Sequence, residues 1–135
     1  MKHCLLLAFT TLAFALGPQQ TRSAPAQRTF ELRTYHVAPG KFDALHARFR
    51  NHATTLLPKH GMTLVGFWVP TDPDRANTLI YLVAHESRVA ADRSWAAFRA
   101  DPEWIRVKAE SEKDGPLVTN VESVFMSPTD YSAMK

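Results

Sequence analysis

The stretch Phe30-Glu31-Leu32-Arg33-Thr34-Tyr35-His36-Val37, followed by Ala38-Pro39-Gly40, determines how the rest of the chain is interpreted. Apolar and polar side chains alternate over its eight residues, which predicts a β-strand, and the Pro-Gly pair marks the turn between this strand and a helix. Successive side chains of a strand point to opposite sides of the sheet, so one side can pack in a core while the other lines a site. The two sides are Phe30, Leu32 and Thr34, and Glu31, Arg33 and Tyr35.

The first 26 residues have the pattern of a secretory signal peptide. A short basic start is followed by an apolar run from Cys4 to Gly17, and Ala24-Pro25-Ala26 fits a cleavage site. The run is too short to span a bilayer comfortably, although an uncleaved anchor or a buried element of the fold are the alternatives. We expect a signal peptide over residues 1–26, a mature domain over residues 27–135, a secreted or periplasmic location, and no stable membrane span after cleavage.

The mature domain is nearly neutral. Removal of residues 1–26 takes away Lys2 and Arg22 and leaves 14 basic against 13 acidic residues, without a basic run, which argues against nucleic-acid binding. The only cysteine, Cys4, is removed as well, so disulfides and cysteine-based metal sites are excluded. No histidine pair has the spacing of a metal motif, and haem ligation has no preferred histidine, so we predict no metal and no cofactor.

The remaining elements follow from periodicity and turn residues. Apolar residues at three- and four-residue steps predict a helix over about 40–57, and Pro58 marks its end or a kink. Two strands that are apolar on both sides flank a turn-rich hairpin loop. A second helix begins after the N-cap Ser87 and restarts at Asp101-Pro102-Glu103. The predicted later elements are strands 62–69 and 78–85, a loop at 70–77, a helix to Ala100, its continuation, and a strand at 117–126.

The element order β-α-β-β-α-β predicts an α+β, ferredoxin-like sandwich with two helices on one face of a four-stranded antiparallel-type sheet. Right-handed crossovers place strands 29–37 and 78–85 at the centre. Two helices cover one face only, yet strands 62–69 and 78–85 are apolar on both faces. The uncovered face would then expose a patch larger than soluble monomers usually tolerate. We therefore expect a homodimer in which two sheets pack face to face.

The residues also resemble a known family. Glu31-Leu32-Arg33-x-Tyr35 before Pro39-Gly40, then His60-Gly61 and Val65-Gly66-x-Trp68, are similar to motifs of the NIPSNAP domain. The resemblance continues at Ser87, Asp92-Arg93 and Asp101-Pro102-Glu103-Trp104 and covers nearly the whole mature chain. It implies the dimeric α+β barrel group, which includes small monooxygenases, but no shared reaction. Animal members resemble mitochondrial signalling or scaffold proteins, a setting that a signal peptide does not match.

Five residues are candidates for ligand binding: Arg33, Tyr35, His60, Trp68 and Tyr81. If the helices cover Leu32, Arg33 faces the space between two sheets, where it either binds an anion beside Tyr35 or pairs with Glu31 or Glu122. Trp68 and Tyr81 are either aromatic walls of the same pocket or interface core. His60 is either a general base at the pocket mouth or a loop residue.

Three functions follow from these observations. The first is an exported homodimer of unknown activity with a small-molecule pocket between its sheets. The second is a cofactor-poor, monooxygenase-like or isomerase-like enzyme acting on a small aromatic or acidic molecule. The third, a scaffold for protein partners, depends on family analogy alone. The sequence contains no catalytic constellation that decides between them, and the catalytic residues stay unknown.

Overall fold

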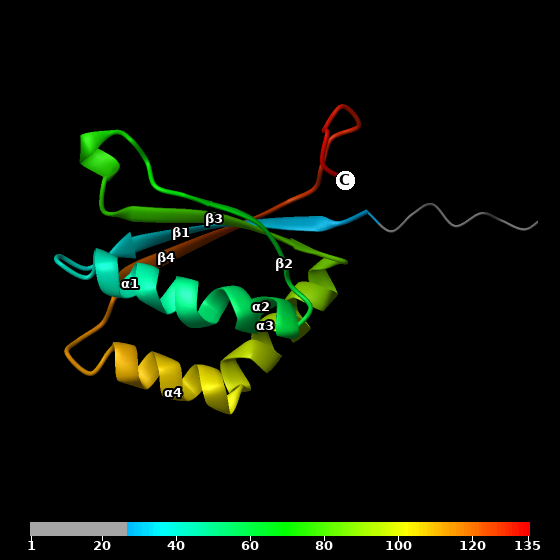
Figure 1. The fold of residues 1–135 in the computed structure, drawn as a ribbon. Coiled ribbons are helices and arrows are strands. Elements are labelled where there is room, and N and C mark those ends of the chain that lie inside the picture. Colours follow the sequence, from blue (N-terminus) through cyan, green and yellow to red (C-terminus); the bar gives the residue numbers. More distant parts are fainter. Residues whose placement is uncertain (1–26) are drawn as a thin grey trace, which may run out of the picture.

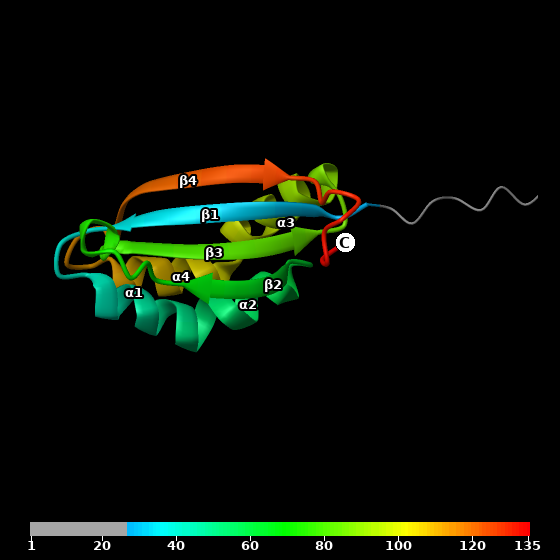
Figure 2. The same cartoon turned by 90° about the horizontal axis from the view of Figure 1, so that it is seen from above.

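The computed structural model describes residues 27–135, so the predicted signal peptide lies outside the described residues. They form one four-stranded antiparallel sheet in the order β2-β3-β1-β4, with all α-helices on one side of it (Figure 1, Figure 2). This is the predicted α+β, ferredoxin-like arrangement. The strands are β1 (Thr29–Val37), β2 (Thr63–Trp68), β3 (Thr78–His85) and β4 (Val118–Met126); the helices are α1 (Phe42–Arg48), α2 (Thr54–Lys59), α3 (Arg88–Ala100) and α4 (Pro102–Ser111).

The central position of β1 and β3 is confirmed. β1 pairs with β3 on one side and with β4 on the other, and both pairings are antiparallel. Arg33 lies opposite Tyr81, and Leu32 lies opposite Leu82. Because residues directly opposite each other share one face of a sheet, this register fixes which side chains of the two strands can meet.

The first helical segment begins and ends about two residues later than predicted and contains a π turn, η1 (Phe49–Ala53), between α1 and α2. The backbone N–H of Thr54 reaches the carbonyl of Phe49, five residues back, and its hydroxyl donates to the same oxygen at 3.0 Å. The segment also continues through Pro58 to Lys59, and Gly61 leaves it with a φ of 81°. A π turn inserts an extra residue, and such insertions are frequent at functional sites.

The second helical segment follows the predicted capping pattern. The Ser87 hydroxyl accepts a hydrogen bond from the Ala90 N–H at 3.1 Å at the start of α3. A carboxylate oxygen of Asp101 accepts from the Glu103 N–H at 2.8 Å, and Pro102 occupies the first position of α4. Each cap satisfies a backbone donor that has no partner inside its helix.

The sides of β1 are reversed relative to our expectation. Glu31, Arg33 and Tyr35 face the helices, whereas Leu32 lies on the open side of the sheet. The polar side can be buried because its groups bind one another and reach Trp95 of α3. Buried polar groups carry little cost once they are hydrogen-bonded, so the apolar side is left for the open face.

The open face of the sheet is apolar along its centre. Trp68 and Val124 are about half exposed, at 51% and 54%, and Leu32, Ile80 and Leu82 lie between them. The loop that contains the short helix η2 (Pro73–Arg75) and the C-terminal segment 127–135 rise on this side, at opposite ends (Figure 1). Strands β2 and β3 therefore present apolar side chains to both faces, as predicted.

Candidate functional site

A buried carboxylate organises the interior between the sheet and α3. Glu31 is 1% exposed, and its two oxygens accept hydrogen bonds from four side chains. Burial alone raises the pKa of Glu31, but the bonds from His85, Ser123, Trp95 and Arg33 outweigh it and lower that pKa from 4.5 to about 2. The donor–acceptor distances are 2.6 Å from Arg33, 3.0 Å from His85, 2.5 Å from Trp95 and 2.7 Å from Ser123.

Arg33 belongs to this cluster. Its guanidinium pairs with Glu31 at 2.6 Å and lies 4.2 Å from the centre of a Trp95 ring. The predicted alternative, an ion pair with Glu31, is confirmed, and the prediction that Arg33 faces a second sheet is wrong. Glu122, the other predicted partner, instead lies 2.6 Å from His36 on the open face.

Tyr35 and Tyr81 lie beside Arg33 on the helix side of the sheet. The Tyr81 hydroxyl donates to that of Tyr35 at 3.0 Å, and both rings pack edge-on against Phe49. Burial raises the pKa of Tyr81 well above its ordinary value, so this phenol stays protonated near neutral pH. The structure thus brings three of the five predicted site residues together, under the helices rather than on the open face.

The other two candidates lie elsewhere. Trp68 is on the open face, where its ring covers Gly66 so closely that an added Cβ would approach it to 2.7 Å. The prediction that Trp68 and Tyr81 line one pocket is wrong because Phe67, not Trp68, lies opposite Tyr81. His60 is partly buried, with Nε2 2.7 Å from a carboxylate oxygen of Asp101. It therefore joins the end of α2 to the cap of α4.

A small enclosed cavity lies between the helices and the sheet. Its volume is about 10 Å³, enough for one water-sized probe. Aromatic side chains supply most of its wall, and Arg48 is the only charged residue in its lining. The aromatic lining residues are Tyr35, Phe49, Tyr81, Trp95, Phe98 and Trp104.

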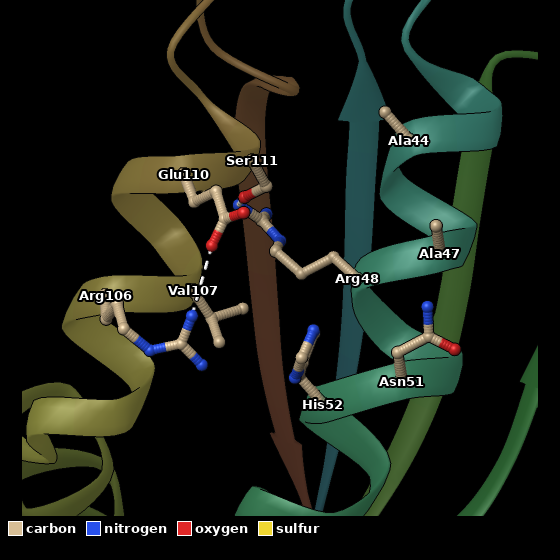
Figure 3. A pocket seen from close by; sticks show the side chains of 9 residues that line it. All are labelled: Ala44, Ala47, Arg48, Asn51, His52, Arg106, Val107, Glu110 and Ser111. Atoms are coloured by element: carbon tan, nitrogen blue, oxygen red, sulfur yellow. Dashed lines mark hydrogen bonds and ion pairs between the residues drawn. The ribbon is translucent and has the colours of Figure 1, made fainter.

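A larger groove lies outside this cavity, between the α1–η1 segment and α4 (Figure 3). Its volume of about 420 Å³ lies within the usual range for small-molecule sites. The α1–η1 side contributes small and polar residues, and α4 contributes an ion pair between Arg106 and Glu110 at 3.1 Å. The lining residues are Ala44, Ala47, Arg48, Asn51, His52, Arg106, Val107, Glu110 and Ser111.

Arg48 separates the groove from the cavity, since it lines both. Its side chain is 4% exposed and crosses from α1 toward α4 (Figure 3). One terminal nitrogen, Nη1, donates to the Ser111 hydroxyl at 3.3 Å and to Glu112 at 2.8 Å. The Nε of Arg48 is buried and has no hydrogen-bond partner within residues 27–135. Such an atom needs an explanation, because buried donors are normally paired.

Arg48 was not among the predicted site residues. A helical projection of the 42–57 segment places Arg48 and His52 along one edge of the apolar stripe formed by Leu45, Phe49 and Leu56. This position at the edge of a buried stripe was the available signal. It did not reveal that α4 would cover the same edge, because that contact joins residues about 60 positions apart.

No cluster of three or more histidine, cysteine, aspartate or glutamate side chains suited to a metal ion occurs within residues 27–135. In the same part of the chain, no helix is both long enough and apolar enough to cross a membrane.

Comparison with known proteins agrees with this architecture. The NIPSNAP family profile matches residues 30–133, which is most of the chain. This chain belongs to the NIPSNAP family. A NIPSNAP family protein of unknown function from Agrobacterium tumefaciens superposes with a TM-score of 0.70 at 22% identity, covering 82% of this chain and 96% of that one. An uncharacterised NIPSNAP-like domain protein from Burkholderia xenovorans gives 0.69 at 20% identity, covering 79% and 90%.

The NIPSNAP fold also extends to more distant proteins. A monooxygenase from Streptomyces coelicolor, solved in complex with nanaomycin D, superposes with a TM-score of 0.56 at 16% identity, covering 83% of this chain and 96% of that one. At such identity the likeness concerns the fold alone. No curated protein matches the chain.

Proposed function

We propose that this NIPSNAP protein binds a small anionic molecule in the groove between the α1–η1 segment and α4. One observation carries the proposal: Arg48 is a nearly fully buried cation at the groove, and its Nε has no partner within the described residues. A guanidinium presents its donors as a planar fork suited to carboxylate or phosphate, so an anion would satisfy the unused edge.

The charges around the groove support an anionic rather than a cationic ligand. Arg48 and Arg106 contribute two positive charges to the lining, against the single negative charge of Glu110. Asn51 and Ser111 add neutral hydrogen-bonding groups, and Ala44 and Ala47 leave room for the ligand. A few polar groups in a site with apolar walls provide orientation, whereas the walls provide contact area.

Titration calorimetry of the purified protein tests this proposal. Benzoate should bind, and benzamide, which has the same ring without the charge, should bind more weakly. Arg48→Met should abolish the preference for benzoate, whereas Arg88→Met, which removes the same charge from an exposed ion pair on α3 outside the groove, should keep it. Equal heats for benzoate and benzamide, or no binding of benzoate and acetate at millimolar concentration, would contradict the proposal.

Chemistry on the bound molecule is a second candidate, favoured by the hydroxyl pair of Tyr35 and Tyr81 beside Arg33. The raised pKa of Tyr81 makes this phenol a hydrogen-bond donor rather than a base near neutral pH. Such a pair would stabilise developing negative charge on a substrate. A turnover assay that follows consumption of the bound molecule, with Tyr81→Phe as the variant, separates this candidate from binding alone.

The open face of the sheet supports a homodimer. Leu32, Leu82 and Val124 form an apolar centre, and the ionisable residues His36 and Glu122 pair with each other at 2.6 Å. The face therefore offers contact area without an uncompensated charge, which a second copy of the same face would match. Two-fold packing of sheets is an established way to bury such surfaces.

Sedimentation velocity tests the dimer. The protein should sediment as a dimer at micromolar concentration, and Trp68→Glu should convert it to a monomer because the new charge would be buried without a partner. Val89→Glu is the matched control, since Val89 is 66% exposed on α3, on the opposite side of the molecule. A monomeric wild type, or an unchanged sedimentation coefficient for Trp68→Glu, would exclude this interface.

Export is proposed from the sequence of residues 1–26, which lie outside the described residues. If the leader is cleaved after Ala26, the mature chain begins at Gln27. Mass spectrometry of the N-terminus of protein recovered from the periplasm or medium should find Gln27. A chain that keeps Met1, or protein recovered only from the cytoplasm, would contradict export.

A further inference from the structure

We infer that Arg48 is a movable barrier between the groove and the aromatic cavity, and that the ligand is a planar aromatic anion. Its ring would enter the cavity while its charge binds Arg48. This inference rests on the proposed function and adds the class of ligand. It follows from one arrangement: Arg48 contributes to the wall of both spaces, and no other residue does so.

The two spaces have different chemistry. The outer groove has two arginines and several polar groups, whereas the wall of the cavity beyond Arg48 is built mainly from aromatic rings. Trp104 lies 5.3 Å from the Arg48 guanidinium, and its ring centre is 4.4 Å from that of Phe98. Aromatic walls favour flat, polarisable ring systems, because they make stacked and edge-on contacts with them. A ligand that used both spaces would therefore carry a charge at one end and a ring at the other.

The cavity is too small for a ring while Arg48 holds its present position, since its volume is about 10 Å³. Access requires the Arg48 side chain to move aside. The guanidinium is held by Nη1 alone, through Ser111 and Glu112, and the planar edge that contains Nε is unused among the described residues. An incoming anion can bind that edge. When the Arg48 side chain shifts, it then exchanges Glu112 for the anion and keeps a negatively charged partner.

The partner that Arg48 would release already has a second cation. Glu112 accepts a hydrogen bond from Lys108 at 2.6 Å, and the Ser111 hydroxyl donates to the Lys108 carbonyl at 3.0 Å. Glu112 is also 20% exposed, so water can solvate its freed oxygen. Glu112 would therefore keep a charged partner and contact with water after Arg48 moves aside. The π turn η1 adjoins the barrier, with Phe49 and Ala53 facing the cavity while Asn51 and His52 face the groove.

Three probes separate the ring from the charge: 2-naphthoate, its neutral analogue 2-naphthalenemethanol, and acetate. Titration calorimetry of the purified protein should give 2-naphthoate a dissociation constant at least about tenfold below either of the others, since a charge-assisted hydrogen bond and ring burial each contribute about that factor. Arg48→Met should weaken 2-naphthoate by about tenfold or more and leave 2-naphthalenemethanol nearly unchanged. Arg88→Met, which removes an arginine from an exposed ion pair on α3 outside the groove, is the control and should stay within about threefold of wild type for all three probes.

Glu112→Gln keeps Arg48 and weakens the hydrogen bond from Arg48 to residue 112, so it tests the barrier without removing the anion-binding group. This variant should bind 2-naphthoate faster and more tightly than wild type, because Arg48 moves aside more easily. Stopped-flow fluorescence measures the association, since Trp104 and Trp95 line the cavity and report entry of the ring. Circular dichroism confirms that each variant is folded before binding is measured. Slower or unchanged association in Glu112→Gln would overturn the barrier.

The outcomes distinguish this inference from the proposed function. If acetate and 2-naphthoate bind with equal affinity and both depend on Arg48, anion binding in the groove stands and entry of the ring is wrong. If no carboxylate binds at any tested concentration, both fail. Tight binding of 2-naphthoate that is insensitive to Arg48→Met would place the ring elsewhere and overturn the inference.

Discussion

Arg33 and Arg48 each have a buried Nε without a hydrogen-bond partner among the described residues, but their charge partners differ. Arg33 pairs with Glu31, which is 1% exposed and has no lysine or second arginine among its hydrogen-bond partners. Arg48 pairs with Glu112, which is partly exposed and also binds Lys108. Loss of the first pair leaves the Glu31 carboxylate in the interior without its arginine, whereas loss of the second leaves Glu112 with Lys108 as its partner. We therefore expect Arg33 to maintain the fold, and the proposed exchange of partners falls to Arg48.

The largest effect on stability is expected from a change of Glu31, the partner of Arg33. Glu31→Gln should lower the free energy of unfolding by about 3–5 kcal/mol, because Arg33 would lose its counter-charge at the edge of the interior and the donors around the buried carboxylate would lose a charged acceptor. Urea unfolding followed by circular dichroism measures the change. Glu122→Gln, which removes a carboxylate from the exposed pair with His36, is the control and should cost less than about 1 kcal/mol. Equal costs for the two variants would break the distinction between buried and exposed carboxylates.

The second largest effect is expected from acid, which should lower the stability that the Glu31 carboxylate contributes. The pKa of Glu31 is lowered to about 2 in the folded state, so its contribution is present above its ordinary pKa of 4.5 and is lost as the pH falls toward 2. The shift corresponds to about 3 kcal/mol at neutral pH. Urea midpoints measured between pH 6 and pH 2 should fall steeply for wild type and more gently for Glu31→Gln. Parallel curves would show that other groups cause the acid dependence.

Replacement of each arginine by methionine should give a smaller difference in the free energy of unfolding. Arg33→Met should cost about 3 kcal/mol, since Glu31 loses its cation inside the protein. Arg48→Met should cost about 1 kcal/mol, since Glu112 keeps Lys108 and contact with water. Thermal unfolding of both variants at one pH tests this difference. A larger loss for Arg48→Met than for Arg33→Met would reverse the assignment of roles.

The smallest effect is expected at the outer edge of the groove. Arg106 and Glu110 form an exposed pair one helical turn apart, with side chains 61% and 69% exposed. Arg106→Met should change the free energy of unfolding by less than about 0.5 kcal/mol, as is usual for such pairs. Chemical denaturation measures it. A loss above about 1 kcal/mol would mean that this exposed pair contributes to the fold.

The fold could be predicted from the sequence because its signals are local. Alternation in β1, the Ser87 and Asp101 caps and the turn residues of the 70–77 loop each depend on a few neighbouring residues. The double-sided apolar character of β2 and β3 also depends on composition alone. These signals sufficed for the order of the elements, the central strands and the helix-covered sheet.

The site depended on contacts between distant residues and could be predicted only in part. The polar side of β1 faces the helices because His85, Trp95 and Ser123 converge on Glu31 from three other elements. No local pattern in residues 29–37 contains this information. The π turn at Phe49–Ala53 and the meeting of Arg48 with α4 have the same origin, so Arg33, Tyr35 and Tyr81 were found and Arg48 was not.

The most direct test compares the two arginines in one experiment. Nitrogen-15 NMR resolves the Nε–H groups of arginine side chains, and substitution of each arginine assigns its signal. Addition of 2-naphthoate should shift and sharpen the Arg48 signal in proportion to occupancy and leave the Arg33 signal in place. An unchanged Arg48 signal at saturating 2-naphthoate, or equal shifts of both signals, would contradict the account.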